Sequence, residues 1–332
     1  MIKNYKYILF IGFIILIPIV YKTLNSNDEK NTASYYLRMI DKYLINKDNP
    51  LGNMDKPCLW IHLHNDDSVI PETNQRKWLS FYSRSTKDFN QPYQYLTVQS
   101  IINKCSNDFN IYLINDDSFK KILPNWNVDF NSIANPIKNN LRLLGICNVL
   151  NLYGGMFVPS SFICLKSLKS IYEKGINNGK DMFVGEFYNN TSTQTCNNLM
   201  ASYELMGCEI NNMQMQKFIK HLEILNSRDF SADIQFLGIN RVWLRDGVLK
   251  GKINMVDANK LGILKNNGDI VNVNELVGSE FIEFPKECIG IYVPWDQLIL
   301  RNKLQWFVKL SSREVLESNT VIGKYLLTNG CN

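Results

Sequence analysis

The sequence predicts an α/β fold in which helices flank a mixed sheet. Two observations carry this prediction. An apolar run at 58–63, a helical segment at 92–105 and an apolar run at 110–114 follow in order, and an acidic turn ends them. An apolar helix at 138–152 then leads into a Gly-Gly break and two short strands. A chain of 332 residues with 45% hydrophobic content forms one large domain or two modest ones and is not disordered.

The first strand, helix and strand follow from local patterns. The segment 92–105 has apolar residues at Tyr95, Val98 and Ile101, the spacing of one helix face. The strand at 110–114 ends in a turn that contains Asp116 and Asp117. Ligands of open α/β sheets bind at the carboxyl ends of strands, so we expect these two carboxylates to lie near a binding site.

The helix at 138–152 is apolar around most of its circumference, which predicts that it is buried. Pro136 precedes it, and Gly154 and Gly155 end it. Arg142 is its only charge beyond the first residue, and a buried arginine needs a partner. That partner is Asp116, Asp117, Glu186 or a bound diphosphate.

Later segments predict a strand at 182–186, a helix-rich stretch at 201–225 and a strand at 231–238. On the last of these, Asp233 and Gln235 share one face. Residues 285–332 are expected to form a helical extension.

The N-terminus predicts a signal-anchor at residues 1–22. Residues 7–21 carry no charge, two lysines precede them and one follows. A cleaved signal peptide is the alternative, but no small-x-small site follows the segment. The flanking lysines predict a single-pass type II protein. Residues 23–56 are then a stem, and the domain at 57–332 is lumenal or extracellular.

Charge and cysteine content exclude some functions. The formal charge of +5 is spread along the chain, which does not support nucleic-acid binding. None of the eight cysteines has CxxC spacing, which does not support a structural zinc site. Cys196 and Cys208 lie in a polar stretch and form either a disulfide or two of eight reduced thiols.

Residues 138–168 resemble the sugar-binding core of a known enzyme family. The glycine turn and strand at 153–158, the strand at 162–168 and the spacing Asn139-x-x-Arg142 carry the likeness. They resemble glycosyltransferases of the DXD sugar-binding type, family 32, which have a GT-A-like (Rossmann-like) fold. In that family the helix motif is Asp-x-x-Arg, one turn further along, and Asp-x-Asp stands where this chain has Pro159-Ser160-Ser161. The same turn also resembles a divergent branch of membrane-anchored proteins from large DNA viruses.

The resemblance implies a nucleotide-sugar donor, a glycan or glycoprotein acceptor, and transfer of a hexose with retention. It also implies Mn²⁺, but the carboxylates that hold the ion in the family are absent here, and serine hydroxyls are poor ligands for a hard cation. Three outcomes remain. Basic residues stabilise the leaving diphosphate without metal, another pair such as Asp116 and Asp117 recruits the ion, or the chain is an inactive relative that binds or scaffolds at the membrane.

The candidate residues each have a structural alternative. Arg142 and Asp233 are the predicted catalytic residues, Asp233 by its place in the resembled family, and Arg142 is otherwise a structural ion pair. The predicted substrate-binding residues are Asp116, Asp117, Gly154, Gly155, Ser160 and Ser161. The two aspartates otherwise cap the helix near residue 118, and the two serines otherwise satisfy the backbone of their own turn.

Overall fold

A computed structural model describes residues 35–36, 38–45, 51–52, 55–63, 91–133, 135–177, 182–188, 199–227 and 238–330. The chain divides into two units, Met1–Lys42 and Tyr43–Asn332. In the first, the described residues are helical. No helix of the described residues is long and apolar enough to cross a membrane, and residues 1–34 lie outside that description.

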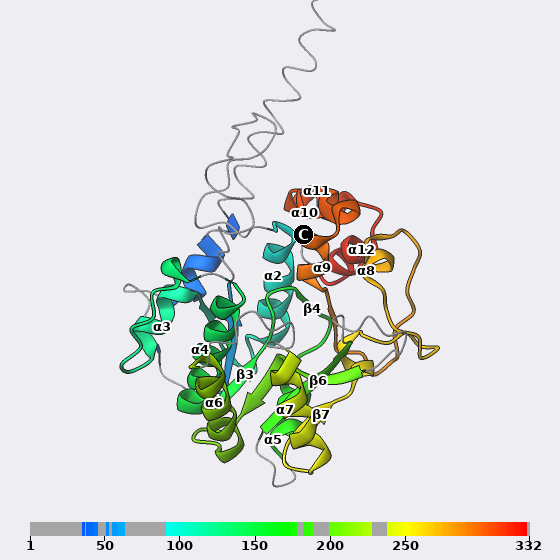
Figure 1. Ribbon diagram of the computed structural model, residues 1–332. Coiled ribbons are helices and arrows are strands. Elements are labelled where there is room, and N and C mark those ends of the chain that lie inside the picture. The colour runs from blue at the N-terminus through cyan, green and yellow to red at the C-terminus, as the bar shows by residue number, and fades with distance from the viewer. Residues whose placement is uncertain are drawn as a thin grey trace, which may run out of the picture. The chain divides into compact units, whose positions relative to one another are not determined.

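The second unit is built on a mixed sheet with helices packed against it, which confirms the predicted α/β class (Figure 1). The six strands have the spatial order β2-β1-β3-β6-β5-β7. Their bounds are β1 Cys58–His62, β2 Asn110–Ile114, β3 Gly155–Phe157, β5 Met182–Tyr188, β6 Leu199–Cys208 and β7 Asn254–Val256. Strand β6 is antiparallel to both of its neighbours, and the other adjacent pairs are parallel. A separate two-stranded sheet pairs β4, Phe162–Cys164, with β8, Gly290–Tyr292.

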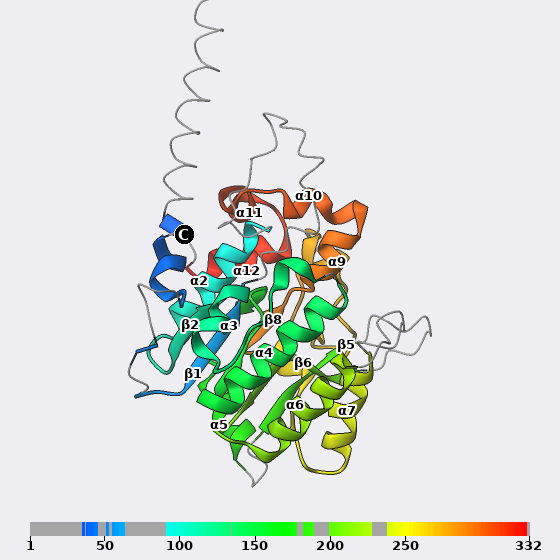
Figure 2. The ribbon, with the colours of Figure 1, turned by 60° about the vertical axis from the view of Figure 1, so that its left-hand side comes forward.

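Helices α4 and α6 pack side by side over the large sheet, and α7 packs on β6 (Figure 2). The longer helices are α2 Tyr93–Cys105, α4 Ile137–Tyr153, α6 Met213–Asn226 and α7 Gly238–Leu249. The shorter ones are α3 Asp116–Ile122, α5 Lys169–Ile176, α8 Val273–Val277, α9 Trp295–Leu300, α10 Gln305–Val308, α11 Ser312–Glu317 and α12 Val321–Thr328. Single 3-10 turns lie at Phe130–Ser132, Ala258–Leu261 and Asn302–Leu304.

The order of the first three strands creates a switch point. Strand β1 has β2 on one side and β3 on the other, and all three are parallel. Ligands of open α/β sheets bind beyond the carboxyl ends of the strands at such a point, where the strand order reverses. The residues at this edge are His62 at the end of β1, Asp116 after β2 and the Pro159–Ser161 turn after β3.

The Gly-Gly break explains how the buried helix α4 enters the sheet. Gly154 ends α4 with φ +67°, and Gly155 starts β3 with φ +92°. A Cβ at Gly155 would overlap the carbonyl oxygen of Cys58, so only glycine lets β3 lie this close to β1. The buried indole of Trp60 donates a hydrogen bond to the carbonyl oxygen of Gly154 (3.0 Å), which fixes the break against β1.

The predicted helix-rich stretch at 201–225 is wrong in its first half. Residues up to Cys208 belong to β6, and a helix begins only at Met213. Leu, Met, Ala and Glu favour helices, but pairing with β3 and β5 places this segment inside the sheet and overrides that local preference. The predicted strand at 231–238, with Asp233, falls on residues 231–237 that lie outside the described part of the chain.

Candidate functional site

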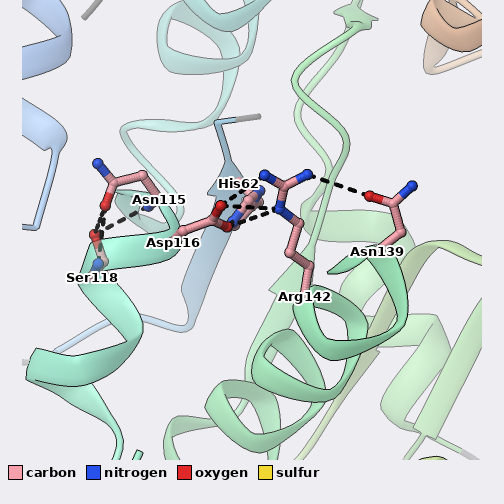
Figure 3. A network of polar contacts seen from close by, with 6 residues as sticks. All are labelled: His62, Asn115, Asp116, Ser118, Asn139 and Arg142. Carbon is pink, nitrogen blue, oxygen red and sulfur yellow. Dashed lines mark hydrogen bonds and ion pairs between the residues drawn. The ribbon is translucent and has the colours of Figure 1, made fainter. Parts of the chain in front are cut away.

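An ion-pair network joins three elements at the carboxyl edge of the sheet. Arg142 donates from Nε to Asp116 Oδ1 (2.9 Å) and from Nη2 to Asp116 Oδ2 (2.7 Å), which is a bidentate fork. His62 Nε2 lies 3.2 Å from Asp116 Oδ1. Asn139 accepts a hydrogen bond from Arg142 Nη1 (3.3 Å). Figure 3 shows the Asp116 carboxylate in contact with both the His62 imidazole and the Arg142 guanidinium. Asp116 is one of the partners that the sequence predicted for Arg142.

The helix geometry explains why these residues meet. Helix α4 runs toward the start of β3, so its first turns lie at the opposite, carboxyl edge of the sheet. Arg142 is in the second turn of α4, and Asp116 begins α3 directly after β2. Asn115 caps α3 by accepting a hydrogen bond from the Ser118 backbone (2.9 Å), so neither aspartate is the cap. Asp116 is thereby left to pair with Arg142.

The electrostatics fix the charge of Asp116. Burial opposes its ionisation, but hydrogen bonds and charge from His62 and Arg142 prevail and hold the pKa of this carboxyl well below its usual range. The Arg142 side chain is 2% exposed and that of Asp116 is 21% exposed. This pair is therefore ionised at neutral pH and mostly removed from water. Asp117, the next residue, is exposed.

The Pro159–Ser161 turn is buried and bonded to helix α2. Ser160 Oγ donates to Gln94 Oε1 (2.9 Å), and Thr97 Oγ1 donates to the carbonyl oxygen of Ser160 (2.5 Å). The carbonyl oxygen of Ser161 accepts from the backbone of Val293 (3.0 Å), at the end of β8. The Ser160 hydroxyl and the two serine carbonyl groups therefore have partners on α2 and at the end of β8, whereas the buried Ser161 hydroxyl has no hydrogen-bond partner among the described residues. Whether either serine contacts a substrate stays a prediction.

The structure does not bring Gly154 and Gly155 to this edge. Both are buried at the amino end of β3, where Gly155 pairs with Cys208 and lies against Cys58. Strand β3 spans three residues, or about 10 Å, so the glycines and the Ser160 turn lie at opposite ends of it. We therefore place the two glycines in the scaffold of the site and not among its contacts.

A second group of ionisable side chains was missed by the sequence analysis. Glu204 of β6, Arg241 of α7 and Asp296 of α9 interact electrostatically, and all three are half-buried. Tyr203 and Tyr292 also interact electrostatically with Arg241. The guanidinium carbon of Arg241 lies 5.8 Å from the ring centroid of Tyr203. We name these three residues the Glu204–Arg241–Asp296 cluster. The one sign of this cluster in the sequence is Glu204, a single acidic residue within the apolar segment 199–208.

Strand register places this cluster near the Pro159–Ser161 turn. The last paired residues of β3 and β6 are Phe157 and Met206, and Glu204 lies two residues beyond, toward the carboxyl end of β3. Phe162 of β4 pairs with Tyr292 of β8, and Asp296 follows four residues after Tyr292. Glu204 and Asp296 thus approach the turn from β6 and from the segment after β8.

The cluster holds a carboxyl group that titrates near neutral pH. Burial raises the pKa of Glu204 to about 7; the charge of Arg241 lowers it and that of Asp296 raises it further. Burial also raises the pKa of Asp296, although hydrogen bonding and the charge of Arg241 oppose the shift. With Glu204 protonated the three side chains sum to zero charge, and with Glu204 ionised they sum to one negative charge.

The residues at the turn do not fit a manganese ion. Ser160 and Ser161 are neutral, and the hydroxyl of Ser160 is already bonded to Gln94. Among the residues that the structure describes, no group of three or more His, Cys, Asp or Glu could hold a metal. The predicted catalytic Asp233 lies outside those residues.

Three solved structures with low similarity to this chain are glycosyltransferases. One is involved in the glycosylation of the major capsid of PBCV-1, with 9% identity, a TM-score of 0.38, and coverage of 72% of this chain and 93% of that one. The apo form of GlyE from Streptococcus pneumoniae TIGR4 has 9% identity, a TM-score of 0.33, and coverage of 62% and 46%. The PaToxG glycosyltransferase has 10% identity, a TM-score of 0.32, and coverage of 67% and 78%. TM-scores this low do not establish a shared fold or activity.

No protein-family model matches the chain, and no curated protein matches it. The function must therefore be argued from the residues at the carboxyl edge of the sheet.

Proposed function

We propose that the protein is a glycosyltransferase that moves a hexose from a nucleotide diphosphate-sugar to a glycan or protein acceptor. The observation that carries the proposal is the Glu204–Arg241–Asp296 cluster beside the Pro159–Ser161 turn. It combines one cation with two carboxyl groups and tyrosines at the edge of the sheet where ligands of α/β proteins bind. The sequence likeness at 138–168 supports the same reading.

Each member of the cluster has a role in this proposal. The leaving group is a nucleoside diphosphate, whose negative charge grows as the bond to the sugar breaks. Arg241 would stabilise that charge, since a guanidinium binds phosphate oxygens in a bidentate manner. The carboxyl groups of Glu204 and Asp296 would hydrogen-bond sugar hydroxyls. No step uses a metal, because the turn does not offer ligands for one.

Titration of purified full-length protein with UDP- and GDP-sugars tests the proposal, with binding and nucleoside diphosphate release measured in Mn²⁺ and in EDTA. We expect Arg241→Gln to weaken donor binding at least tenfold. Arg245→Gln is the matched control, because Arg245 lies on the same helix but its side chain is 49% exposed and pairs with Asp246. If no donor binds, or if both variants behave alike, the proposal is wrong.

A second candidate is a catalytically inactive protein that binds ligands or has a structural role on the same fold. It is favoured by two polar side chains at the edge that already have partners in the protein, because Asp116 is held by Arg142 and Ser160 by Gln94. This candidate predicts donor or glycan binding without release of nucleoside diphosphate. The release assay therefore separates the two functions.

The proposal extends to the N-terminus. Residues 1–22 would anchor the protein in a membrane as a single-pass type II protein, with the domain lumenal or extracellular. The uncharged residues 7–21 and the lysines around them support this topology. Protection of the domain from added protease in sealed vesicles, lost on adding detergent, is the expected result. Digestion in intact vesicles contradicts it.

A further inference from the structure

Two buried cysteines face each other between helix α2 and strand β4. The sulfur atoms of Cys105 and Cys164 are 3.8 Å apart, although the residues are 59 positions apart in the sequence. Both side chains are fully buried. Among the six cysteines that the structure describes, these are the two whose sulfurs are in contact. Cys208, which the sequence left as either a disulfide partner of Cys196 or a reduced thiol, is buried in β6, and Cys196 lies outside the described residues.

Hydrogen bonds around the two cysteines hold helix α2 against strand β4. Three hydrogen bonds already join α2 to the chain around Ser160, and the nearest of them to the sulfurs runs from the Cys164 backbone to Ser100 Oγ (2.9 Å). The thiol of Cys164 also donates to the carbonyl oxygen of Lys166 (3.0 Å). A disulfide bond is about 2.05 Å long, so the sulfurs must approach by less than 2 Å. The two elements are thus fixed close to bonding distance before any bond forms.

We propose that Cys105 and Cys164 form a disulfide that bonds α2 covalently to β4, three residues after the Pro159–Ser161 turn. The bond is a modification of the scaffold and does not depend on the proposed activity. It would form wherever the folding chain meets a thiol oxidant, such as the oxidising environment of a lumen or the cell exterior.

The chemistry balances with a small disulfide as the oxidant. The thiolate of Cys105 attacks one sulfur of oxidised glutathione, which forms a mixed disulfide and releases one glutathione thiolate. The thiolate of Cys164 then attacks the sulfur of Cys105 and displaces the second glutathione. Two electrons pass to the oxidant, and the two protons of the cysteines end on the two glutathione molecules.

Disulfide mapping of the full-length protein tests this proposal. One sample is folded with oxidised and reduced glutathione and the other with excess dithiothreitol. Both are alkylated after unfolding and digested. We expect a Cys105–Cys164 linked peptide in the first sample and two alkylated cysteines in the second. Full alkylation of both cysteines in the oxidised, folded sample would overturn the proposal.

Thermal unfolding provides a second measurement that needs no variant. Closing a loop of 59 residues should raise Tm of the oxidised protein by about 7 °C over the reduced protein. Cys105→Ser should remove this difference. Cys288→Ser should retain it, and it is a matched control because Cys288 is also buried and donates to the carbonyl oxygen two residues ahead. A redox difference in Tm that survives in Cys105→Ser, or is absent in the wild type, contradicts the bond.

Discussion

Asp116→Asn removes the charge that neutralises the buried Arg142. The new side chain has nearly the same shape but no negative charge, and one of its two terminal groups is a hydrogen-bond donor. The Arg142 fork would lose its second acceptor, and the guanidinium, with 2% of its side chain exposed, would lose its counter-charge. We therefore expect a destabilised protein, because a buried charge without a partner costs more than the pair contributes.

The magnitude follows from burial and size. Breaking a fully buried pair costs about 3–5 kcal/mol, and the 21% exposure of Asp116 places this pair at the low end, about 3 kcal/mol. The unit Tyr43–Asn332 has 290 residues (332 − 42), which gives an unfolding entropy of about 0.6 kcal/mol/K. The expected fall in Tm is therefore about 5 °C.

Urea and thermal unfolding followed by circular dichroism would measure this loss. Asp117→Asn is the matched control, because Asp117 is the adjacent residue and is exposed. The double variant Asp116→Leu/Arg142→Met should recover most of the loss, since removing both charges leaves neither one buried alone. Equal stability of Asp116→Asn and Asp117→Asn would refute the reasoning.

The pH dependence gives an independent check. The pKa of Asp116 is lower in the folded protein than its ordinary value of 3.8, so on acidification the unfolded chain takes up this proton first. The stabilisation is complete above the ordinary value and is lost as pH falls through it toward the folded pKa. Wild-type stability should fall more steeply than that of Asp116→Asn between pH 5 and 3.

Two further predictions concern other positions. Gly155→Ala should cost at least about 3 kcal/mol in urea unfolding or abolish soluble expression, because its Cβ meets the Cys58 carbonyl at φ +92°. Gly251→Ala, at φ +67° with nothing nearby, should cost only about 1–2 kcal/mol, and similar losses at both sites would contradict the close approach. Because burial raises the pKa of Glu204 to about 7 from 4.5, its folded form keeps a proton that the unfolded chain releases. Stability from this group is full below pH 4.5 and is lost as pH rises to 7. Wild type should therefore lose about 1–3 kcal/mol more than Glu204→Gln between pH 5 and pH 8. Parallel pH profiles for the two proteins would count against a buried, proton-holding Glu204.

Much of the fold was predictable because its early elements are locally consistent. The apolar runs at β1 and β2, the helix face of α2 and the glycines that end α4 each point to one structure. The same local reasoning failed at 199–208, where residues that favour helices form β6. That strand exists because β3 and β5 provide partners on both sides, and no local pattern encodes their presence.

The site was predictable only in part, for a similar reason. The need of Arg142 for a partner follows from one charge on an apolar helix, and Asp116 was among the partners considered. Glu204, Arg241 and Asp296 are far apart in the sequence, and no motif joins them. They interact because the middle of β6 and the first turns of α7 and α9 come together near the carboxyl end of β3.

Local sequence patterns were enough to predict the α/β class, the buried helix α4 and the glycine break, because burial periodicity and backbone freedom are local properties. The groups that share the carboxyl edge became known only from the packing of the folded chain. In the folded protein Gly154 and Gly155 lie at the amino end of β3, away from the carboxyl edge. Arg142 pairs with Asp116, and Cys105 lies beside Cys164. The order of the strands and the direction of the connections between them bring distant residues together. Both depend on long-range strand pairing, which no short segment of the sequence specifies.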